Sequence, residues 1–209
     1  MNRNFFLDFD GTLIDPRDRL YKLFMELVPE ASFSFEDYWK IKNSRVIQSD
    51  LLTKWFQYGA DDIAKFKTCW MNKVEERARL DLDRPFEGVS RILGELSNKH
   101  GLFLVTARQK PEFVAWQLEK FGWSKFFKRI LVTEQRSSKA ELIRSLQTFS
   151  GDDVLVGDTG EDVQTAHELN LISVAVGSGF LSKEILQSYK PNFLLNSISE
   201  LHETGLVQS

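Results

Sequence analysis

The first hydrophobic pattern in the chain is a short apolar run that ends in two carboxylates. Residues 4–7 contain three bulky apolar side chains, and Asp8, Asp10 and Gly11 follow closely. A short apolar run before a turn signal is typical of a strand buried on both faces. Residues i and i+2 of a strand point the same way, so Asp8 and Asp10 are expected to point to one place beyond it. Taken alone, the stretch is equally compatible with a strand that ends in a polar turn.

After Leu13 the pattern becomes helical and stays helical through residues 15–83. Apolar side chains recur there at intervals of three and four residues, as on amphipathic helices. The predicted helical faces lie in residues 20–28, 38–41, 47–56 and 63–74. Ser34 and Asp37 resemble a capping box, and Gly59 is a predicted helix stop. The aromatic stripes of this block favour packing over a cofactor site.

From Phe86 onward, short apolar runs alternate with helical patterns. The predicted strands are residues 102–105, 130–132, 154–156, 172–176 and 193–195. Strands that alternate with helices predict an α/β fold, a Rossmann-like doubly wound parallel sheet with helices on both faces. Pro16 and Pro85 flank the helical block, so we expect it to be an inserted unit.

Polar side chains follow three of the predicted strands. They are Asp8 and Asp10, then Thr106, then Asp158 and Asp162. Ligands of such sheets bind beyond the carboxyl ends of the strands. Two like charges about 4 Å apart repel by roughly 4 kcal/mol at an effective dielectric constant near 20, so protons or a cation must neutralise this cluster. An all-oxygen site suits Mg²⁺ better than zinc.

The same residue types suit phosphoryl transfer. A carboxylate can attack phosphorus and form an aspartyl-phosphate. The transferring oxygens then need neutral donors and a cation, which Thr106 and Lys139 can provide. A second carboxyl group, for which Asp10 is placed, can protonate the leaving oxygen and later activate water. The simpler alternatives are an N-cap for Thr106, a solvated first-turn lysine for Lys139 and a capping box for Thr159 and Asp162.

Composition narrows the class of protein. The chain has 209 residues, a formal charge of −3 and one cysteine, Cys69. The acidic balance argues against a nucleic-acid surface. A lone cysteine fits a reducing compartment, and Cys69 is expected to be a small buried apolar residue. We find neither a signal peptide nor a membrane-spanning run, and therefore expect a cytoplasmic protein with no membrane partner. His100, His167 and His202 lack ligand spacing and are expected at the surface or at helix ends.

Four short motifs together resemble those of the haloacid dehalogenase superfamily. They are Asp8-Phe9-Asp10-Gly11-Thr12-Leu13, Thr106, Lys139 and the segment from Gly157 to Asp162. The resemblance covers essentially the whole chain, with the motifs in the family's order. Within the superfamily, the chain is similar to the subgroup of phosphoglycolate phosphatases. It implies a catalytic core of residues 1–14 and 84–209, a helical cap domain of residues 15–83, and a first strand between those that end at Thr106 and Asp158.

The resemblance also implies roles for single residues. Asp8 is then the nucleophile and Asp10 the general acid and base. Phosphate is held by Thr106, Ala107 and Lys139. Magnesium is held by Asp8, the Asp10 carbonyl and Asp158, with Asp162 acting through water or in support. Lys139 lacks the proline that often follows it in relatives.

Within the superfamily, Asp10 favours phosphoryl chemistry over dehalogenation. A β-phosphoglucomutase of this superfamily would usually carry histidine where this chain has Leu20. We therefore expect a Mg²⁺-dependent phosphatase that hydrolyses a small-molecule phosphate monoester, as a monomer or homodimer. The alternatives are a phosphosugar mutase, a pyrophosphatase, and a catalytically idle binding or regulatory protein.

Substrate specificity is expected to come from the cap and from Arg108. Relatives place a substrate-reading loop where this chain has Lys40, Lys42, Asn43, Ser44 and Arg45. Lys42 or Arg45 could meet an anionic part of the substrate, or this segment could be a solvated basic turn. Arg108 stands where relatives often have a smaller residue, so it is expected to contact substrate or to pair with the cap.

Overall fold

The structure is a computed structural model that describes residues 3–208. The chain forms two compact units. The first runs as far as Asp15 and resumes at Pro85, and the second comprises residues 16–84. Two short strands lie where the chain passes between the units, β2 (Ile14–Asp15) and β3 (Arg84–Pro85), and they pair with one another.

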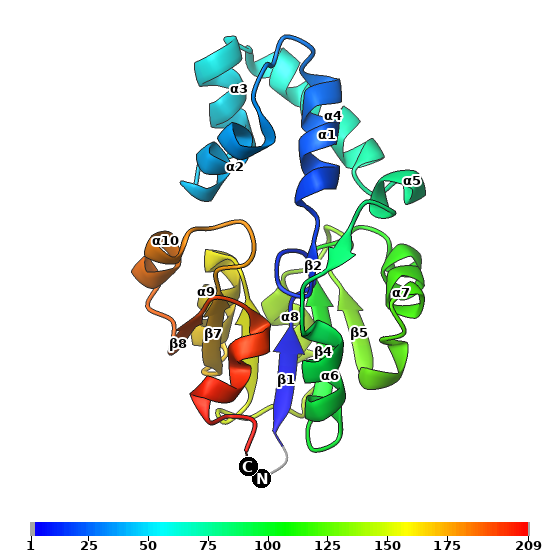
Figure 1. The fold of residues 1–209 in the computed structure, drawn as a ribbon, viewed down its shortest axis with the longest axis vertical. Helices are drawn as coiled ribbons and strands as arrows, with labels where there is room; N and C mark the ends of the chain where they lie inside the picture. Colours follow the sequence, from blue (N-terminus) through cyan, green and yellow to red (C-terminus); the bar gives the residue numbers. More distant parts are fainter. Residues whose placement is uncertain (1–2, 209) are drawn as a thin grey trace. The chain divides into compact units, whose positions relative to one another are not determined.

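The first unit is built on a parallel sheet of six strands in the order β5-β4-β1-β6-β7-β8. The strands are β1 (Asn4–Leu7), β4 (Gly101–Thr106), β5 (Arg129–Val132), β6 (Val154–Gly157), β7 (Ile172–Val176) and β8 (Phe193–Leu195). β1 pairs with β4 on one side and with β6 on the other, as the family resemblance implies (Figure 1). The strand order reverses at β1, which brings the ends of β1, β4 and β6 to one edge.

Helices cover both faces of this sheet, as the alternating pattern predicts. They are α6 (Val89–Ser97), α7 (Pro111–Lys120), α8 (Lys139–Arg144), α9 (Gly160–Glu168) and α10 (Lys183–Ser188), with 3₁₀ turns η1 (Ser124–Phe126) and η2 (Ile198–Thr204). Phe5 and Leu7 pack with α6, α7 and η2, whereas Phe6 packs with α8 and α9. Successive side chains from Phe5 to Leu7 thus enter opposite cores, so apolar side chains are required on both faces of β1.

The second unit is entirely helical. Its helices are α1 (Arg17–Leu27), α2 (Phe35–Asn43), α3 (Gln48–Phe56), α4 (Ala60–Lys73) and α5 (Arg77–Leu80). Phe24 lies at the centre of its aromatic cluster, 4.8 Å from the Tyr38 ring and 6.3 Å from the Phe66 ring between centroids. A buried ion pair joins Arg19 Nε to Asp83 Oδ1 at 2.7 Å and ties the beginning of the unit to its end.

Several local predictions are wrong. Cys69 is exposed, because it lies on the polar side of α4. His100 does lie at the end of α6, where its N–H donates to the Leu96 carbonyl, but it is buried and not at the surface, with its ring 5.1 Å from the Phe5 ring between centroids. Gly59 is the N-cap of α4 and not a helix stop, because α3 already ends before Gln57, its C-cap residue, which is left-handed at φ 57°. The capping interaction of Ser34 with the Asp37 N–H is confirmed at 3.1 Å. Between residues 3 and 208, no helix combines the length and the apolar character that a bilayer crossing needs.

Candidate active site

Asp8 is the first residue beyond β1, and the backbone still holds it to the sheet. Its N–H donates to the Val156 carbonyl at 2.9 Å, so the carboxylate leaves the sheet at a fixed angle. A tight loop then folds back, because the Leu13 and Ile14 N–H groups both donate to the Phe9 carbonyl. Gly11 has a φ of +86°, and a Cβ there would overlap the Asp158 carboxylate. Glycine is therefore required at this position for conformation and for space.

Asp158 and Asp162 come from the end of β6 and the first turn of α9. Asp158 is fully buried, and its Oδ2 accepts the Phe180 N–H at 2.7 Å. Asp162 Oδ2 accepts the Thr159 N–H at 3.1 Å and the Thr159 hydroxyl at 2.6 Å, so Asp162 does form the helix cap of the alternative interpretation. The cap uses Oδ2 of Asp162, and the other oxygen, Oδ1, is free of the cap and faces Asp8.

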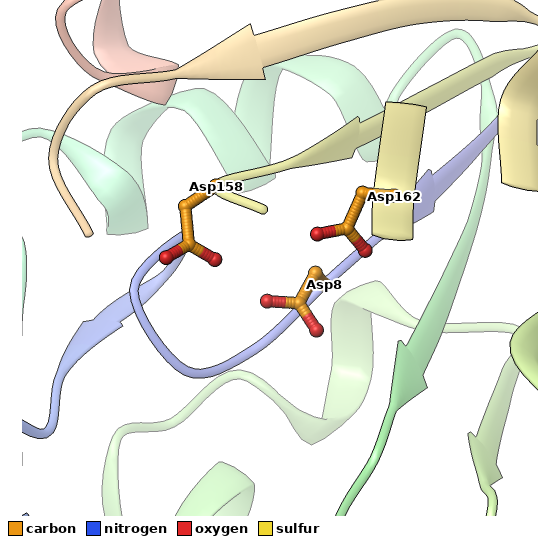
Figure 2. Close-up of side chains that lie close together, drawn as sticks. All are labelled: Asp8, Asp158 and Asp162. Atoms are coloured by element: carbon orange, nitrogen blue, oxygen red, sulfur yellow. The ribbon is translucent and has the colours of Figure 1, made fainter. Parts of the chain in front are cut away.

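The three carboxylates converge. One oxygen from each of Asp8, Asp158 and Asp162 lies within 4.8 Å of the others, and all three residues are buried. Figure 2 shows the three side chains facing a common space, with Asp8 and Asp158 leaving neighbouring strand ends. Residues separated by some 150 positions in the chain thus form one acidic cluster, because β1 and β6 are neighbours.

Lys139 is the buried cation of this cluster. Its Nζ donates to Asp8 Oδ1 at 2.6 Å and to Asp162 Oδ1 at 2.6 Å. A capping box fixes the start of α8, since the Glu141 N–H donates to Ser138 Oγ and the Ser138 N–H donates to Glu141 Oε2. Lys139 is therefore not the solvated first-turn lysine of the alternative interpretation, because its side chain is buried and doubly paired.

Burial and mutual repulsion shift the protonation of the cluster. Burial raises the pKa of Asp8 to about 7, against the opposing effect of Lys139. Burial also raises the pKa of Asp158 well above its ordinary value, and the charges of Asp8 and Asp162 add to the rise. Burial disfavours the charged form of Lys139, but Asp162 and Asp8 outweigh it and raise the pKa of the lysine. The raised pKa values of Asp8 and Asp158 indicate that these buried carboxyl groups resist ionising together beside the single cation Lys139.

Thr106 ends β4, and its side chain is buried at the same sheet edge. The loop that precedes α8 holds the backbone at Thr106 and Ala107 through two hydrogen bonds. The Thr133 N–H donates to the Thr106 carbonyl at 3.0 Å, and Gln135 Nε2 donates to the Ala107 carbonyl at 2.6 Å. Lys139 follows that loop directly, so the loop fixes the position of Lys139 relative to the Thr106 segment.

Arg108 pairs with Asp10. Arg108 Nη2 donates to Asp10 Oδ1 at 2.7 Å, and Arg108 Nε donates to Asp10 Oδ2. The Arg108 side chain is 5% exposed and that of Asp10 is 19% exposed. This partner lies in the first unit and was not among the contacts expected for Arg108.

The specificity residues expected in the helical unit do not all lie in a loop. Lys42 and Asn43 belong to the last turn of α2, and Ser44 is the residue after it. Arg45 is exposed with φ 69°. Lys42 Nζ donates to the Val46 carbonyl at 2.9 Å, and burial lowers the pKa of Lys42 to about 8.

Sequence reasoning missed the site contacts of three residues, Thr12, Ser178 and Phe180. Thr12 Oγ1 lies 3.2 Å from Asp8 Oδ2 and 3.4 Å from Asp158 Oδ1, between the two carboxylates. Ser178 Oγ donates to the Gly11 carbonyl at 2.9 Å. Together with the Phe180 N–H, Ser178 makes the loop after β7 a support for the site. The Gly-Ser-Gly turn at residues 177–179 was the available signal.

Comparison with known proteins agrees with this geometry. A curated relative, a 5′-nucleotidase of Pseudomonas aeruginosa, is 27% identical over 213 aligned positions, which cover 96% of this chain and 94% of the relative. The pyrophosphatase PpaX of Listeria monocytogenes is 22% identical over 205 positions, covering 93% of this chain and 92% of the relative.

Solved structures share the fold. A haloacid dehalogenase-like family hydrolase from Streptococcus pneumoniae superposes with a TM-score of 0.77 at 20% identity, covering 98% of each chain. A predicted phosphatase from Clostridium acetobutylicum superposes with a TM-score of 0.72 at 24% identity, covering 99% of each chain.

The model of one protein family matches residues 5–176, which include Phe5–Leu7 of β1 and all four motifs. With the sheet order and the acidic cluster at its edge, this match confirms the resemblance inferred from the motifs. The chain belongs to the haloacid dehalogenase-like hydrolase family.

Proposed function

We propose that the protein is a Mg²⁺-dependent phosphatase that hydrolyses a small-molecule phosphate monoester through a phosphorylated Asp8. The observation that carries the proposal is the environment of Asp8. One oxygen is held by Lys139 Nζ at 2.6 Å, and the other faces Thr12 and the Asp158 carboxylate. A nucleophile beside a cation and beside a second carboxylate suits attack on an anionic phosphoryl group.

The residues present fit a divalent cation. Three buried carboxylates face one lysine, which leaves a net charge of −2 when all are ionised. The donors are all oxygen, as Mg²⁺ prefers. Asp8, Asp158 and the Asp10 carbonyl would hold the ion, with Asp162 acting through water because its oxygens already accept from Lys139 and Thr159. Bound Mg²⁺ would neutralise charge on Asp8 and on the phosphoryl oxygens.

The chain's own groups account for two successive steps. An oxygen of Asp8 attacks phosphorus, the bond from phosphorus to the leaving oxygen breaks, and Asp10 gives its proton to that oxygen. Asp10 then takes a proton from water, the water oxygen attacks phosphorus, and the Asp8–phosphorus bond breaks to release phosphate. Thr106, Ala107 and Lys139 would hold the phosphoryl oxygens throughout. The second unit, residues 16–84, would act as the cap, with Lys42, Asn43, Ser44 and Arg45 reading the substrate.

A metabolite panel tests the proposal. Purified protein with Mg²⁺ is assayed for phosphate release from alkyl and aryl phosphate monoesters, nucleoside 5′-monophosphates and inorganic pyrophosphate. The names of the two curated relatives motivate the last two classes. Turnover of monoesters above pyrophosphate supports the proposal, and turnover of pyrophosphate alone favours the pyrophosphatase. Absence of turnover on every class would favour an idle binding protein.

Replacing Asp158 by asparagine tests the metal site without an activity assay. In chelator near neutral pH, Asp158→Asn is expected to raise Tm by at least about 2 °C, because asparagine removes a carboxyl group that must either be buried as an anion beside Asp8 and Asp162 or take up a proton when the chain folds. For the wild type, Mg²⁺ roughly a hundredfold above its Kd is expected to raise Tm by at least about 4 °C. The variant should lose that rise.

Differential scanning fluorimetry with and without Mg²⁺ measures both effects. Asp152→Asn is the matched control, since Asp152 is exposed in the turn before β6. An Asp158→Asn variant that keeps the full Mg²⁺-induced rise in Tm would remove Asp158 from the proposed ligands.

A further inference from the structure

Arg108 is held from three directions. Its backbone carbonyl accepts the Glu134 N–H at 3.0 Å, so the loop before α8 fixes its main chain. The guanidinium carbon lies 5.6 Å from the centroid of the fully buried Phe9 ring. Nε and Nη2 donate to the two carboxylate oxygens of Asp10. A long side chain held in this way has little remaining freedom.

The bidentate contact determines how the Asp10 carboxylate is oriented. Paired donors from the rigid guanidinium fork hold both oxygens and therefore fix the plane of the carboxylate, which a single donor cannot do. Both side chains are largely buried, so water competes little for these bonds. The backbone of Asp10 is fixed independently by the loop in which the Leu13 and Ile14 N–H groups donate to the Phe9 carbonyl.

We propose that Arg108 is a positioning residue that aims the Asp10 carboxylate at the leaving oxygen of the substrate and, in the second step, at the attacking water. This inference rests on the proposed function, in which Asp10 transfers those protons. Arg108 does not touch the reacting atoms in this role. It acts through Asp10, since proton transfer requires the carboxylate within hydrogen-bond reach of the oxygen that it serves.

A positioning role for Arg108 and a substrate-binding role predict different effects on kcat/KM. Protonation by Asp10 matters most for a poor leaving group, such as an alkoxide, and least for an aryl oxide. A positioning residue therefore affects kcat/KM of an alkyl phosphate more than that of an aryl phosphate. A residue that binds the phosphoryl group lowers both to the same extent.

The test is a double-mutant cycle between Arg108→Lys and Asp10→Asn. Lysine keeps the charge but offers one nitrogen, so it loses the fork. With glycerol 3-phosphate, or the best alkyl phosphate of the panel, Arg108→Lys is expected to lower kcat/KM by roughly a hundredfold, within the range for general acid–base catalysis. With p-nitrophenyl phosphate the loss is expected to stay below about tenfold. In the Asp10→Asn background, Arg108→Lys should change kcat/KM for p-nitrophenyl phosphate less than about threefold.

Arg91→Lys is the matched control, because Arg91 forms an exposed ion pair with Glu95 on α6. Equal losses on both substrates, or a loss that persists in the Asp10→Asn background, would assign Arg108 to substrate binding and overturn the inference. Unchanged kinetics in Arg108→Lys and in Arg108→Gln would overturn it as well. Asp8→Asn separates the two proposals: full activity in that variant refutes the phosphorylated Asp8, whereas an inactive Asp8→Asn beside an unaffected Arg108→Lys refutes only the positioning role.

Discussion

Replacing Asp8 by asparagine is expected to lower kcat by at least about a thousandfold, which corresponds to about 4 kcal/mol of barrier. Asparagine has nearly the same shape but lacks the anionic oxygen that attacks phosphorus. Lys139 keeps its second partner, Asp162 Oδ1 at 2.6 Å, so the lysine stays paired in the variant. The fold should therefore persist while the reaction fails.

Steady-state assays on the best substrate of the panel measure this effect, and circular dichroism confirms the fold. Asp152→Asn again serves as the control and is expected to keep wild-type turnover, since Asp152 is exposed and outside the acidic cluster. An Asp8→Asn variant with near-wild-type kcat would contradict the covalent mechanism.

The second large effect is expected for Lys139→Met, on stability as well as activity. The substitution leaves Asp8 and Asp162 buried without their shared cation. Removing one partner of a buried ion pair costs about 3–5 kcal/mol, so the free energy of unfolding in chelator should fall by that amount. In the proposed mechanism phosphatase activity should fall too, because methionine cannot take over the phosphoryl contact proposed for Lys139.

Urea denaturation in chelator measures the loss, with Lys67→Met, at an exposed site on α4, as the neutral control. The double variant Lys139→Met with Asp162→Asn is expected to recover about half of the lost stability, since one unpaired charge is removed. If Lys139→Met were as stable as the wild type, the lysine would not be the counter-ion of the cluster.

Much of the fold could be predicted from periodicity alone. The apolar run before Asp8 requires burial on both faces, and each later strand is short, apolar and bounded by turn residues. The order β4-β1-β6 was expected through the family resemblance, and it is what brings Asp8 to Asp158. Gly11 belongs to the turn signal after the first predicted strand, and the structure adds the close approach of Asp158 to this glycine.

Contacts between side chains could not be predicted in the same way. The pairing of Arg108 with Asp10 depends on where the loop before α8 holds the segment after β4. No pattern in the sequence indicates that position. The burial of His100 depends on its packing against Phe5, nearly a hundred residues away. Cysteine is usually buried, which favoured a buried Cys69, but the exposure of this residue depends on its position on the helix.

The most direct measurement is identification of the phosphorylated residue during turnover. The enzyme is mixed with Mg²⁺ and its best substrate, quenched in acid and digested, and the peptide that contains Asp8 is examined by mass spectrometry. The Asp10→Asn variant is treated in parallel with p-nitrophenyl phosphate, whose leaving group needs little protonation, so slower attack by water should let the intermediate accumulate. The account predicts one added phosphoryl group on Asp8 in both proteins and more of it in the variant. Rapid release of phosphate with Asp8 unmodified in both proteins, or a phosphoryl group on another residue, would contradict it.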